Sequence, residues 1–227
     1  MIIGVDGCRT GWLGVIWDGG SLASAAVYPA FEDILKLKAR FIAVDMPIGF
    51  PERAEAGGRA CERLARKLIG LRRSSVFSSP ARITLGGGDY ADASKRNRAA
   101  SDNIGISSQA FNIFPKIREI DALITPDLQS RLAEVHPEVS FRLMKGQDLA
   151  HPKKKAEGRA ERRALLEQAG FPLGKLESPP KGGWGEDDLL DACACAWSAQ
   201  RLAHGQALRL PEVPEYDARG LRMEICG

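Results

Sequence analysis

The segment at 184–197, WGEDDLLDACACAW, constrains the fold more than any other part of this sequence. It opens with carboxylates and continues with small apolar residues, and its pattern predicts a helix over about 186–203. Asp188 and Asp191 lie three positions apart and therefore share one face of that helix. The same face continues through Ala192, Cys195, Ala199 and Leu202. Because such small side chains let a helix lie close to a sheet, we expect these carboxylates to reach the edge of one.

Short strand-like runs elsewhere in the chain predict the sheet. The runs at 2–5, 12–17 and 22–28 are separated by turn residues and form a predicted antiparallel meander. The run at 41–44 is apolar throughout and too short for a helix, which is typical of a buried parallel strand. A further short strand is predicted at 132–135. This order predicts an α/β fold with a mixed five-stranded sheet and helices on both of its faces.

The remaining segments form helices, loops and a tail, and no linker divides the chain. Apolar periodicity predicts helices near 31–38, 58–69 and 108–124 and within 151–166. Residues 72–89 are rich in Ser, Pro and Gly, so we expect an exposed loop there. The tail after Pro211 is expected to be peripheral. We therefore predict one domain over 1–227 with a helical and loop insertion at about 58–130.

Composition argues against several classes of protein. The chain has five cysteines without CxxC spacing and three histidines, so neither a zinc site nor a disulfide framework is expected. No run approaches the roughly 18 apolar residues of a membrane span. The opening MIIGVDG lacks the basic region of a signal peptide, so we expect a cytoplasmic protein. The net charge of +3 is mild, but basic residues cluster in HPKKKAEGRAERR at 151–163.

Four aspartates occur where the predicted elements would bring them together. Asp6 ends the first strand and Asp45 ends the fourth, and ligands of open sheets collect at the carboxyl ends of strands. Together with Asp188 and Asp191 they could not all stay ionised without a cation, and magnesium or manganese would suit their oxygen ligands. Simpler explanations exist for most of them. Helix capping accounts for Asp188 and a turn for Asp6 or Asp45, whereas Asp191 lies beyond the first helical turn.

The order of these acids resembles the ribonuclease-H-like superfamily, and especially its four-way-junction resolvases. The resemblance rests on Asp6 in GVDG, on Asp45, on Asp188 and Asp191 in DLLDACACA, and on the basic segment ahead of the last helix. A closer resemblance covers nearly the whole chain. It is to the family known as domain of unknown function 429, described as predicted ribonuclease-H-like nucleases. Its motifs here are GVDGCRTGW, AVDMPIGFP, GLRRSSVFSSP, SQAFNIFPKIREID, EVHPEVSF, KKKAEGRAERRALL and DDLLDA.

The resemblance implies a ribonuclease-H-like fold and further site residues. In EVHPEVSF it adds Glu134 as a catalytic candidate, either a metal ligand or a partner of one, with His136 and Glu138 supporting the ligands. His136 and the proline after it could equally serve only to end the strand. The residues in which we first look for phosphate contacts are Arg73, Ser75, Arg82, Gln109, Lys116, Lys153, Lys154, Lys155 and Arg159. Taken singly, each of these types is more often a solvated surface residue.

These inferences favour a metal-dependent nuclease acting on DNA or RNA. Asp6, Asp45 and Asp188 would hold two magnesium or manganese ions, and Asp191 or Glu134 would complete the site. The resolvases act as dimers, so the resemblance also allows a homodimer. The low net charge and the lack of an aromatic and basic stripe argue against nucleic acid as the partner, so nucleic acid is inferred from the site alone.

Two alternatives to the nuclease stay open. The first is a phosphotransferase of the actin and sugar-kinase type, because DGCRTG after the first strand is similar to the phosphate loop of those proteins. The length of this chain argues against that class, since those proteins enclose ATP between two copies of the fold and this chain holds one. The second is a non-catalytic ribonuclease-H-like module that binds a metal, nucleic acid or a protein.

Overall fold

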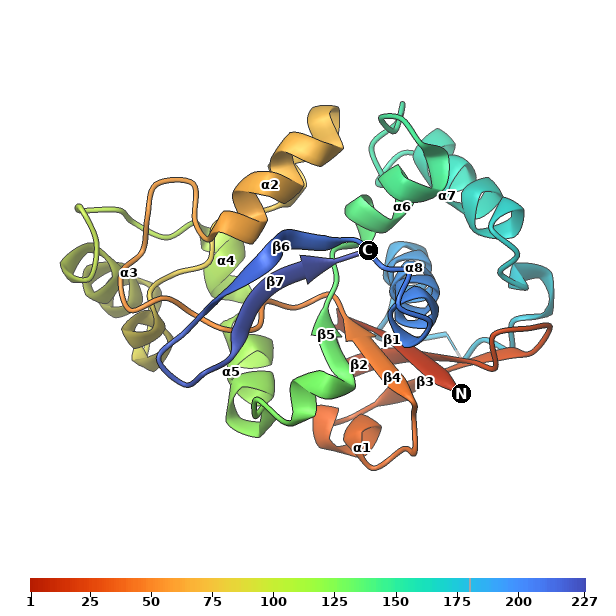
Figure 1. Ribbon diagram of the computed structural model, residues 1–227, viewed down its shortest axis with the longest axis horizontal. Coiled ribbons are helices and arrows are strands. Elements are labelled where there is room, and N and C mark those ends of the chain that lie inside the picture. The colour runs from red at the N-terminus through yellow and green to blue at the C-terminus, as the bar shows by residue number, and fades with distance from the viewer. Residues whose placement is uncertain (180) are drawn as a thin grey trace.

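A five-stranded mixed sheet forms the centre of the computed structural model, which describes residues 1–179 and 181–227. Its strands lie in the order β3-β2-β1-β4-β5 (Figure 1). They are β1 (Ile2–Cys8), β2 (Gly11–Trp17), β3 (Ala23–Tyr28), β4 (Phe41–Val44) and β5 (Leu132–Glu134). β2 is antiparallel to both β1 and β3, whereas β4 is parallel to β1 and β5. The mixed α/β sheet predicted from the sequence is confirmed.

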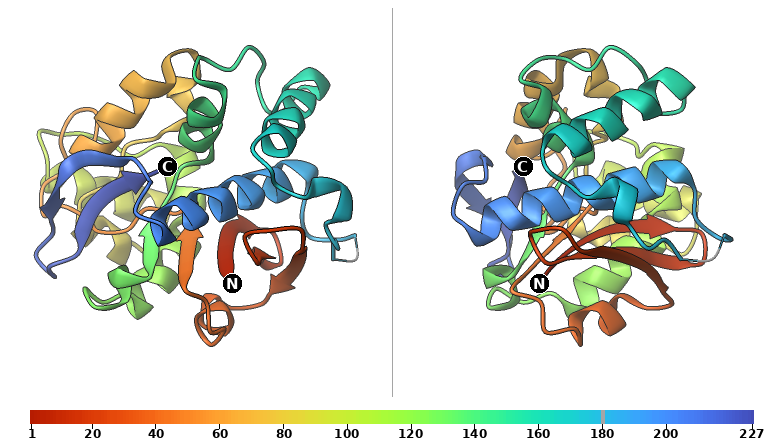
Figure 2. Two further views of the ribbon diagram at one scale, coloured as in Figure 1. Left: turned by 45° about the vertical axis from the view of Figure 1, so that its right-hand side comes forward. Right: turned by 90° about the vertical axis from the view of Figure 1, so that its right-hand side faces the viewer.

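Helices pack on both faces of this sheet, as the two further views show (Figure 2). One face is covered by α8 (Glu186–Ala203), and the other by α1 (Phe31–Leu35) and α5 (Phe114–Leu123). Alternation along β1 explains the division. Ile2 and Cys8 belong to the apolar cluster that contains the α8 residues, while Ile3 and Val5 belong to the cluster that contains the α1 and α5 residues.

The segment between β4 and β5 is more ordered than its composition indicates. It contains α2 (Ala60–Ile69), the 3-10 helices η1 (Gly70–Ser75) and η2 (Arg82–Gly86), α3 (Tyr90–Ala99), α4 (Ser108–Asn112), α5 and η3 (Leu128–Ser130). The expectation of an exposed loop at 72–89 is therefore wrong. Val76 and Leu85 are buried, and the Ala81 N–H donates to the Asn97 side chain, so tertiary contacts satisfy a backbone that lacks long helices.

The chain after β5 also differs from expectation in one place. It forms α6 (Pro137–Lys145), α7 (Ala156–Gln168), η4 (Leu173–Lys175) and α8, followed by a hairpin of β6 (Arg209–Tyr216) and β7 (Arg222–Cys226). The prediction of a peripheral tail is wrong, because Met223, Ile225 and Cys226 are buried. The backbone of Cys226 also forms an isolated parallel β-bridge with that of Val135, which attaches the hairpin to the end of β5.

Two expectations from composition can be compared with the structure. All five cysteines are free and buried, where a thiol packs like a small apolar side chain. Among the described helices, none combines the length and the apolar character needed to cross a bilayer.

The contact between α8 and β1 is unusually close at Gly4. A Cβ atom at this position would lie 2.0 Å from the Ala196 nitrogen and 2.1 Å from the Ala192 oxygen, both in the backbone of α8. No flexible side chain could move aside to make room. The absence of a side chain at Gly4 thus sets how near α8 lies to the sheet.

We predict that Gly4→Ala lowers the free energy of unfolding by about 3 kcal/mol or more, because overpacking forces the helix backbone away from β1. Thermal and denaturant unfolding measure the change. Gly88→Ala is the matched control, since nothing lies within 4 Å of a Cβ at Gly88. Equal stability of the two variants would show that α8 tolerates displacement.

Candidate metal centre

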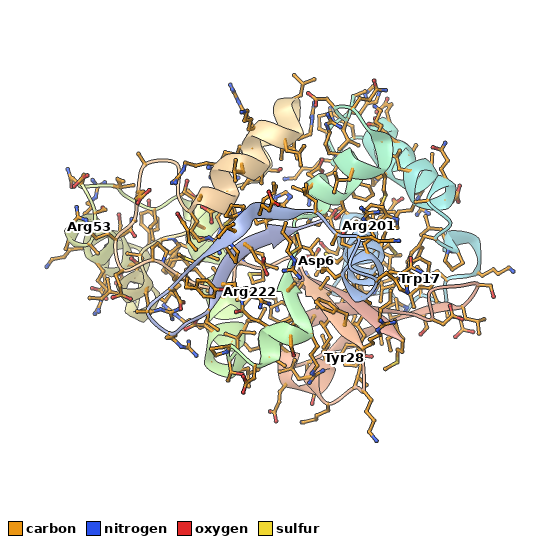
Figure 3. The ribbon with its side chains drawn as sticks, viewed as in Figure 1. Asp6, Trp17, Tyr28, Arg53, Arg201 and Arg222 are labelled. Carbon is orange, nitrogen blue, oxygen red and sulfur yellow. The ribbon has the colours of Figure 1, made fainter. Side chains whose placement is uncertain are left out.

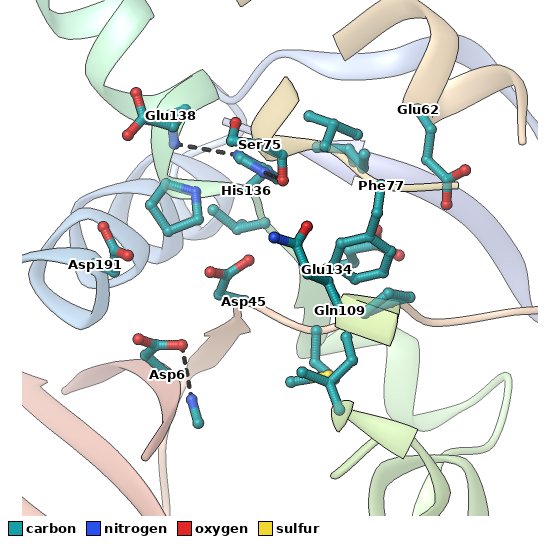
Figure 4. A pocket seen from close by; sticks show the side chains of 18 of the residues that line it. Asp6, Asp45, Glu62, Ser75, Phe77, Gln109, Glu134, His136, Glu138 and Asp191 are labelled. Atoms are coloured by element: carbon teal, nitrogen blue, oxygen red, sulfur yellow. Dashed lines mark hydrogen bonds between the residues drawn. The ribbon is translucent and has the colours of Figure 1, made fainter. Parts of the chain in front are cut away.

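Three aspartates from separate elements meet beside the α8 face of the sheet. Asp6 lies in β1, Asp45 directly follows β4, and Asp191 lies in the second turn of α8. Each offers one carboxylate oxygen, and these oxygens all lie within 4.8 Å of one another. Asp6 projects near the middle of the molecule in the view of Figure 3, and Figure 4 shows the three carboxyl groups around one end of a pocket.

Strand geometry explains why Asp6 and Asp45 are neighbours. β1 and β4 are parallel, with Val5 opposite Val44, and the Asp45 N–H donates to the Val5 carbonyl at 2.9 Å. Alternation puts Asp6 on the same face as Gly4, where α8 approaches most closely. The helix that rests on Gly4 therefore carries its own aspartate to the ends of these two strands.

Burial and mutual repulsion make the three carboxyl groups hard to ionise. Asp6 is 9% exposed and Asp191 only 1% exposed. Burial, followed by the charges of Asp45 and Asp191, raises the pKa of Asp6 well above its usual value. Burial likewise raises the pKa of Asp45, and it raises the pKa of Asp191 to about 7. The folded protein therefore holds protons here unless a cation replaces them.

Lys153 supplies a single positive charge to this cluster. Its ammonium lies 2.5 Å from Asp191 Oδ2. Burial disfavours the ammonium, but the carboxylates of Asp191, Asp45 and Asp6 more than offset this and raise the pKa of Lys153. Three carboxylates and one ammonium leave two negative charges when all are ionised, which is the charge that one divalent cation would balance.

The donor set fits a hard divalent cation. Asp191 Oδ1 is buried and has no hydrogen-bond partner among the described residues. A buried carboxylate oxygen without a partner is costly, and a metal ion would satisfy it. All three side chains offer oxygen, which magnesium and manganese prefer, and no thiolate or imidazole belongs to the group. The residues present could therefore hold such an ion.

Asp188 does not belong to this group of three, although we predicted it as a metal ligand. Its Oδ2 accepts a hydrogen bond from the Gly185 N–H at 2.8 Å, so it caps the start of α8. Its charge still contributes to the raised pKa of Asp6. Both Asp188 and Asp191 were expected on the inner face of the helix, but only Asp191 lies beyond the turn whose free N–H groups need a cap.

The two glutamates of EVHPEVSF are each held by a buried arginine. Glu134 accepts from Arg59 at 2.6 and 2.9 Å and from the Ile48 N–H at 2.7 Å. Glu138 accepts two bonds from Arg162 Nη2, at 2.6 and 2.8 Å. Paired in this way, both glutamates stabilise the elements around the aspartates. Neither belongs to the group of three carboxylates, so their contacts favour supporting roles.

His136 joins two segments at the wall of the pocket. Its Nδ1 accepts from the Glu138 N–H at 3.2 Å, which caps α6. Its Nε2 lies 3.3 Å from the Ser75 carbonyl oxygen, and because Nδ1 accepts, Nε2 donates to it. With both nitrogens occupied, the imidazole positions the loop and is poorly placed to act as a general base.

The residues expected to contact phosphate separate into two groups. The structure places five of them on the pocket lining, namely Ser75, Gln109, Lys116, Lys153 and Lys154. Lys116 is fixed there, because its ammonium lies 4.4 Å from the centre of the Trp12 ring.

The other residues expected to contact phosphate lie outside the pocket lining. Arg82 pairs with Asp121 and Asp217, and Arg159 pairs with Glu186. These ion pairs are structural contacts that the sequence did not indicate. The remaining two, Arg73 and Lys155, are exposed.

The pocket that contains the aspartates has a volume of about 440 Å³ (Figure 4). Several of its residues were not among the predicted site residues, including Arg59 and Phe77. Arg59 lies in no recognisable motif, and its importance follows only from its partners. Phe77 lies within GLRRSSVFSSP, so that motif was an available signal. A ligand in this pocket would contact the carboxylates at one end and Phe77 at the other.

Comparison with known proteins identifies one related family. A family model described as protein of unknown function (DUF429) matches residues 4–216. Neither the curated proteins nor the solved structures contain a match to the chain.

We predict that, without metal, the protein becomes less stable than its Asp45→Asn variant as pH rises. Carboxyl groups with a raised folded pKa stabilise the folded state below the unfolded pKa, and this contribution is lost as pH rises through the folded pKa. The window runs from about 4 to about 7, between the ordinary value and that of Asp191. At pH 7 in EDTA the variant should be more stable by about 1 kcal/mol or more.

Unfolding in EDTA and in excess Mg²⁺ across this pH range measures the effect. Mg²⁺ should raise the melting temperature of the natural protein most near pH 7 and that of Asp45→Asn little. Asp127→Asn makes the same chemical change at an exposed carboxylate and should behave like the natural protein. A pH-independent difference in EDTA would contradict the repulsion described above.

We also predict that Glu134→Gln lowers the free energy of unfolding by roughly 3 kcal/mol, because it removes a charged partner of buried Arg59 and leaves only Glu62. The stabilisation by Mg²⁺ should persist. Thermal unfolding with and without Mg²⁺ measures the loss of stability and the stabilisation by Mg²⁺. Glu157→Gln on the surface is the control. Undiminished stability together with a lost Mg²⁺ response would instead identify Glu134 as a ligand.

Proposed function

The chain belongs to DUF429, a family of unknown function whose model covers residues 4–216. Because the family has no assigned function, we infer the activity from the site, and we propose a metal-dependent nuclease that hydrolyses phosphodiester bonds. The observation that carries this proposal is the convergence of three carboxylates, those of Asp6, Asp45 and Asp191, one of which has an oxygen without a hydrogen-bond partner among the described residues. Such a site suits magnesium or manganese, and nucleic acid is the proposed partner.

Asp6, Asp45 and Asp191 would hold the ion. When bound, a divalent cation can polarise a phosphoryl oxygen and acidify a water molecule. The basic residues of the chain would act on the substrate. Lys116 and Lys153 on the pocket lining are placed to attract the phosphate, and both are anchored, by Trp12 and by Asp191 respectively. Anchored charges need less reorganisation when the charge of the transition state develops.

Hydrolysis forms a bond from the water oxygen to phosphorus and breaks the bond from phosphorus to the leaving oxygen, which takes up a proton. The ammonium of Lys153 would stabilise negative charge near the aspartates, because its raised pKa keeps it protonated. His136 would hold the Ser75 carbonyl and α6 in place. In this proposal no step depends on a free imidazole.

The arrangement of the sheet supports the same proposal by analogy. A meander, a parallel strand on the other side of β1 and a long final helix, with carboxylates on β1, after β4 and on the helix, are the features expected of a ribonuclease-H-like nuclease. Similarity of fold alone does not establish activity. The acids and their charge balance therefore carry more of the proposal than the topology does.

We predict that the protein cleaves DNA or RNA with Mg²⁺ or Mn²⁺ and that Asp6→Asn lowers the rate at least about 1,000-fold, as expected from the loss of a group that stabilises the transition state. Gel assays on single-stranded, duplex, hybrid and branched substrates measure cleavage. Asp187→Asn is the matched control, since it removes a carboxylate of the same helix that does not line the pocket.

Cleavage that survives in Asp6→Asn, or absence of cleavage on all four substrates, would contradict the nuclease proposal. Calorimetry with ATP adds a discriminating result. Tight ATP binding without nucleic-acid cleavage would favour the phosphotransferase alternative.

A further inference from the structure

The pocket has a second end that phosphodiester hydrolysis does not by itself require. Asp6 and Asp191 lie at one end, and Phe77 and Gln109 lie at the other (Figure 4). The carboxylates and lysines account for a phosphate and a metal ion. The aromatic ring of Phe77 and the amide of Gln109 suit a part of the substrate other than the phosphate.

The Phe77 ring is available for stacking. Phe77 is only half-buried and lines the pocket. Among the residues that the structure describes, it belongs to none of the three apolar clusters and makes no ring contact with another aromatic or cationic side chain. A large apolar side chain that the core does not use, facing a cavity, is suited to contact a ligand.

Two amide side chains at the pocket also lack internal partners. Gln109 and Asn112, both on α4, are exposed and line the pocket. Neither side chain forms a hydrogen bond within the described part of the chain. An amide offers both donors and an acceptor, which is what the edge of a nucleobase requires.

We propose that Phe77, Gln109 and Asn112 form a base pocket for a single unpaired nucleotide whose phosphate lies at the three aspartates. This inference rests on the proposed nuclease function and names its substrate class. A base inside a duplex is stacked and paired, so it can stack on Phe77 and offer its edge to the two amides only after leaving the duplex stack. The protein therefore acts on single-stranded segments, ends or extruded nucleotides in preference to fully paired duplex.

The charge of the pocket sets an order of binding. Six carboxylates and four lysine or arginine side chains line it, and Arg162 outside the lining pairs with Glu138, which leaves one negative charge when all are ionised. A phosphate would be repelled until a divalent cation balances the aspartates. Nucleotide binding should therefore depend on Mg²⁺, although the base contacts themselves involve no charge.

Calorimetry with deoxyadenosine 5′-monophosphate tests the pocket directly, because this molecule holds no phosphodiester bond to be cleaved. The protein should bind it with Mg²⁺ and only weakly in EDTA. Phe77→Ala should weaken binding roughly 5- to 150-fold, the effect of losing one base stack, and Phe77→Tyr should retain it. Leu71→Ala, an exposed position of η1 outside the pocket, is the control.

Kinetics on a single-stranded oligonucleotide and on a fully paired, closed duplex provide the second arm. Phe77→Ala should raise KM on the single strand by a similar factor, with kcat and the Mg²⁺ response unchanged, and the duplex should be cleaved poorly. Equal cleavage of both substrates with no effect of Phe77→Ala would overturn the base pocket while leaving the nuclease intact. Phe77-dependent nucleotide binding without any cleavage would retain the pocket and reject the nuclease.

Discussion

The close approach of α8 to β1 is the contact on which the site depends. It is made possible by Gly4 on the strand and by the small residues Ala192 and Ala196 on the helix. Asp191 precedes Ala192 directly, so the distance that sets this packing also sets the distance from Asp191 to Asp6. A bulkier residue in the contact would lift the helix and separate the carboxylates. The packing core and the candidate metal centre are thus two parts of one interface.

The distribution of arginines decides which buried acids remain available. Arg162 pairs with Glu138, and Arg59 lies between Glu134 and Glu62, so each of these carboxylates has a guanidinium partner. Within residues 1–179 and 181–227, Lys153 is the one lysine or arginine paired with the three aspartates, and Asp191 Oδ1 has no hydrogen-bond partner. Because buried charges are costly unless paired, the three aspartates are a place where an added cation would offset that cost. All three aspartates line the pocket, so a ligand there can reach them.

Much of the sheet and part of the site followed from sequence patterns, for identifiable reasons. The meander and the buried strand before Asp45 have short-range signals, and the spacing of Asp191 from Asp188 and Cys195 indicated its face. Asp188 was considered both as a ligand and as a cap, because periodicity places it on the face of Asp191 but does not reveal which N–H groups need a cap. The segment at 72–89 was misjudged for a related reason: composition reports the lack of regular structure, whereas burial depends on distant partners such as Asn97.

The sequence by itself determined the chain order of the five sheet strands and the final helix, the alternation that puts Asp6 on the helix-facing side of β1, and the family. These properties depend on neighbouring residues, so local periodicity records them. Only the tertiary structure decided which acids are paired and which are free. Arg59 lies 75 positions from Glu134 and Arg162 lies 24 from Glu138, and nothing local links them. The same holds for Phe77, whose position opposite the aspartates exists only once the segment between β4 and β5 has folded against the ends of the sheet.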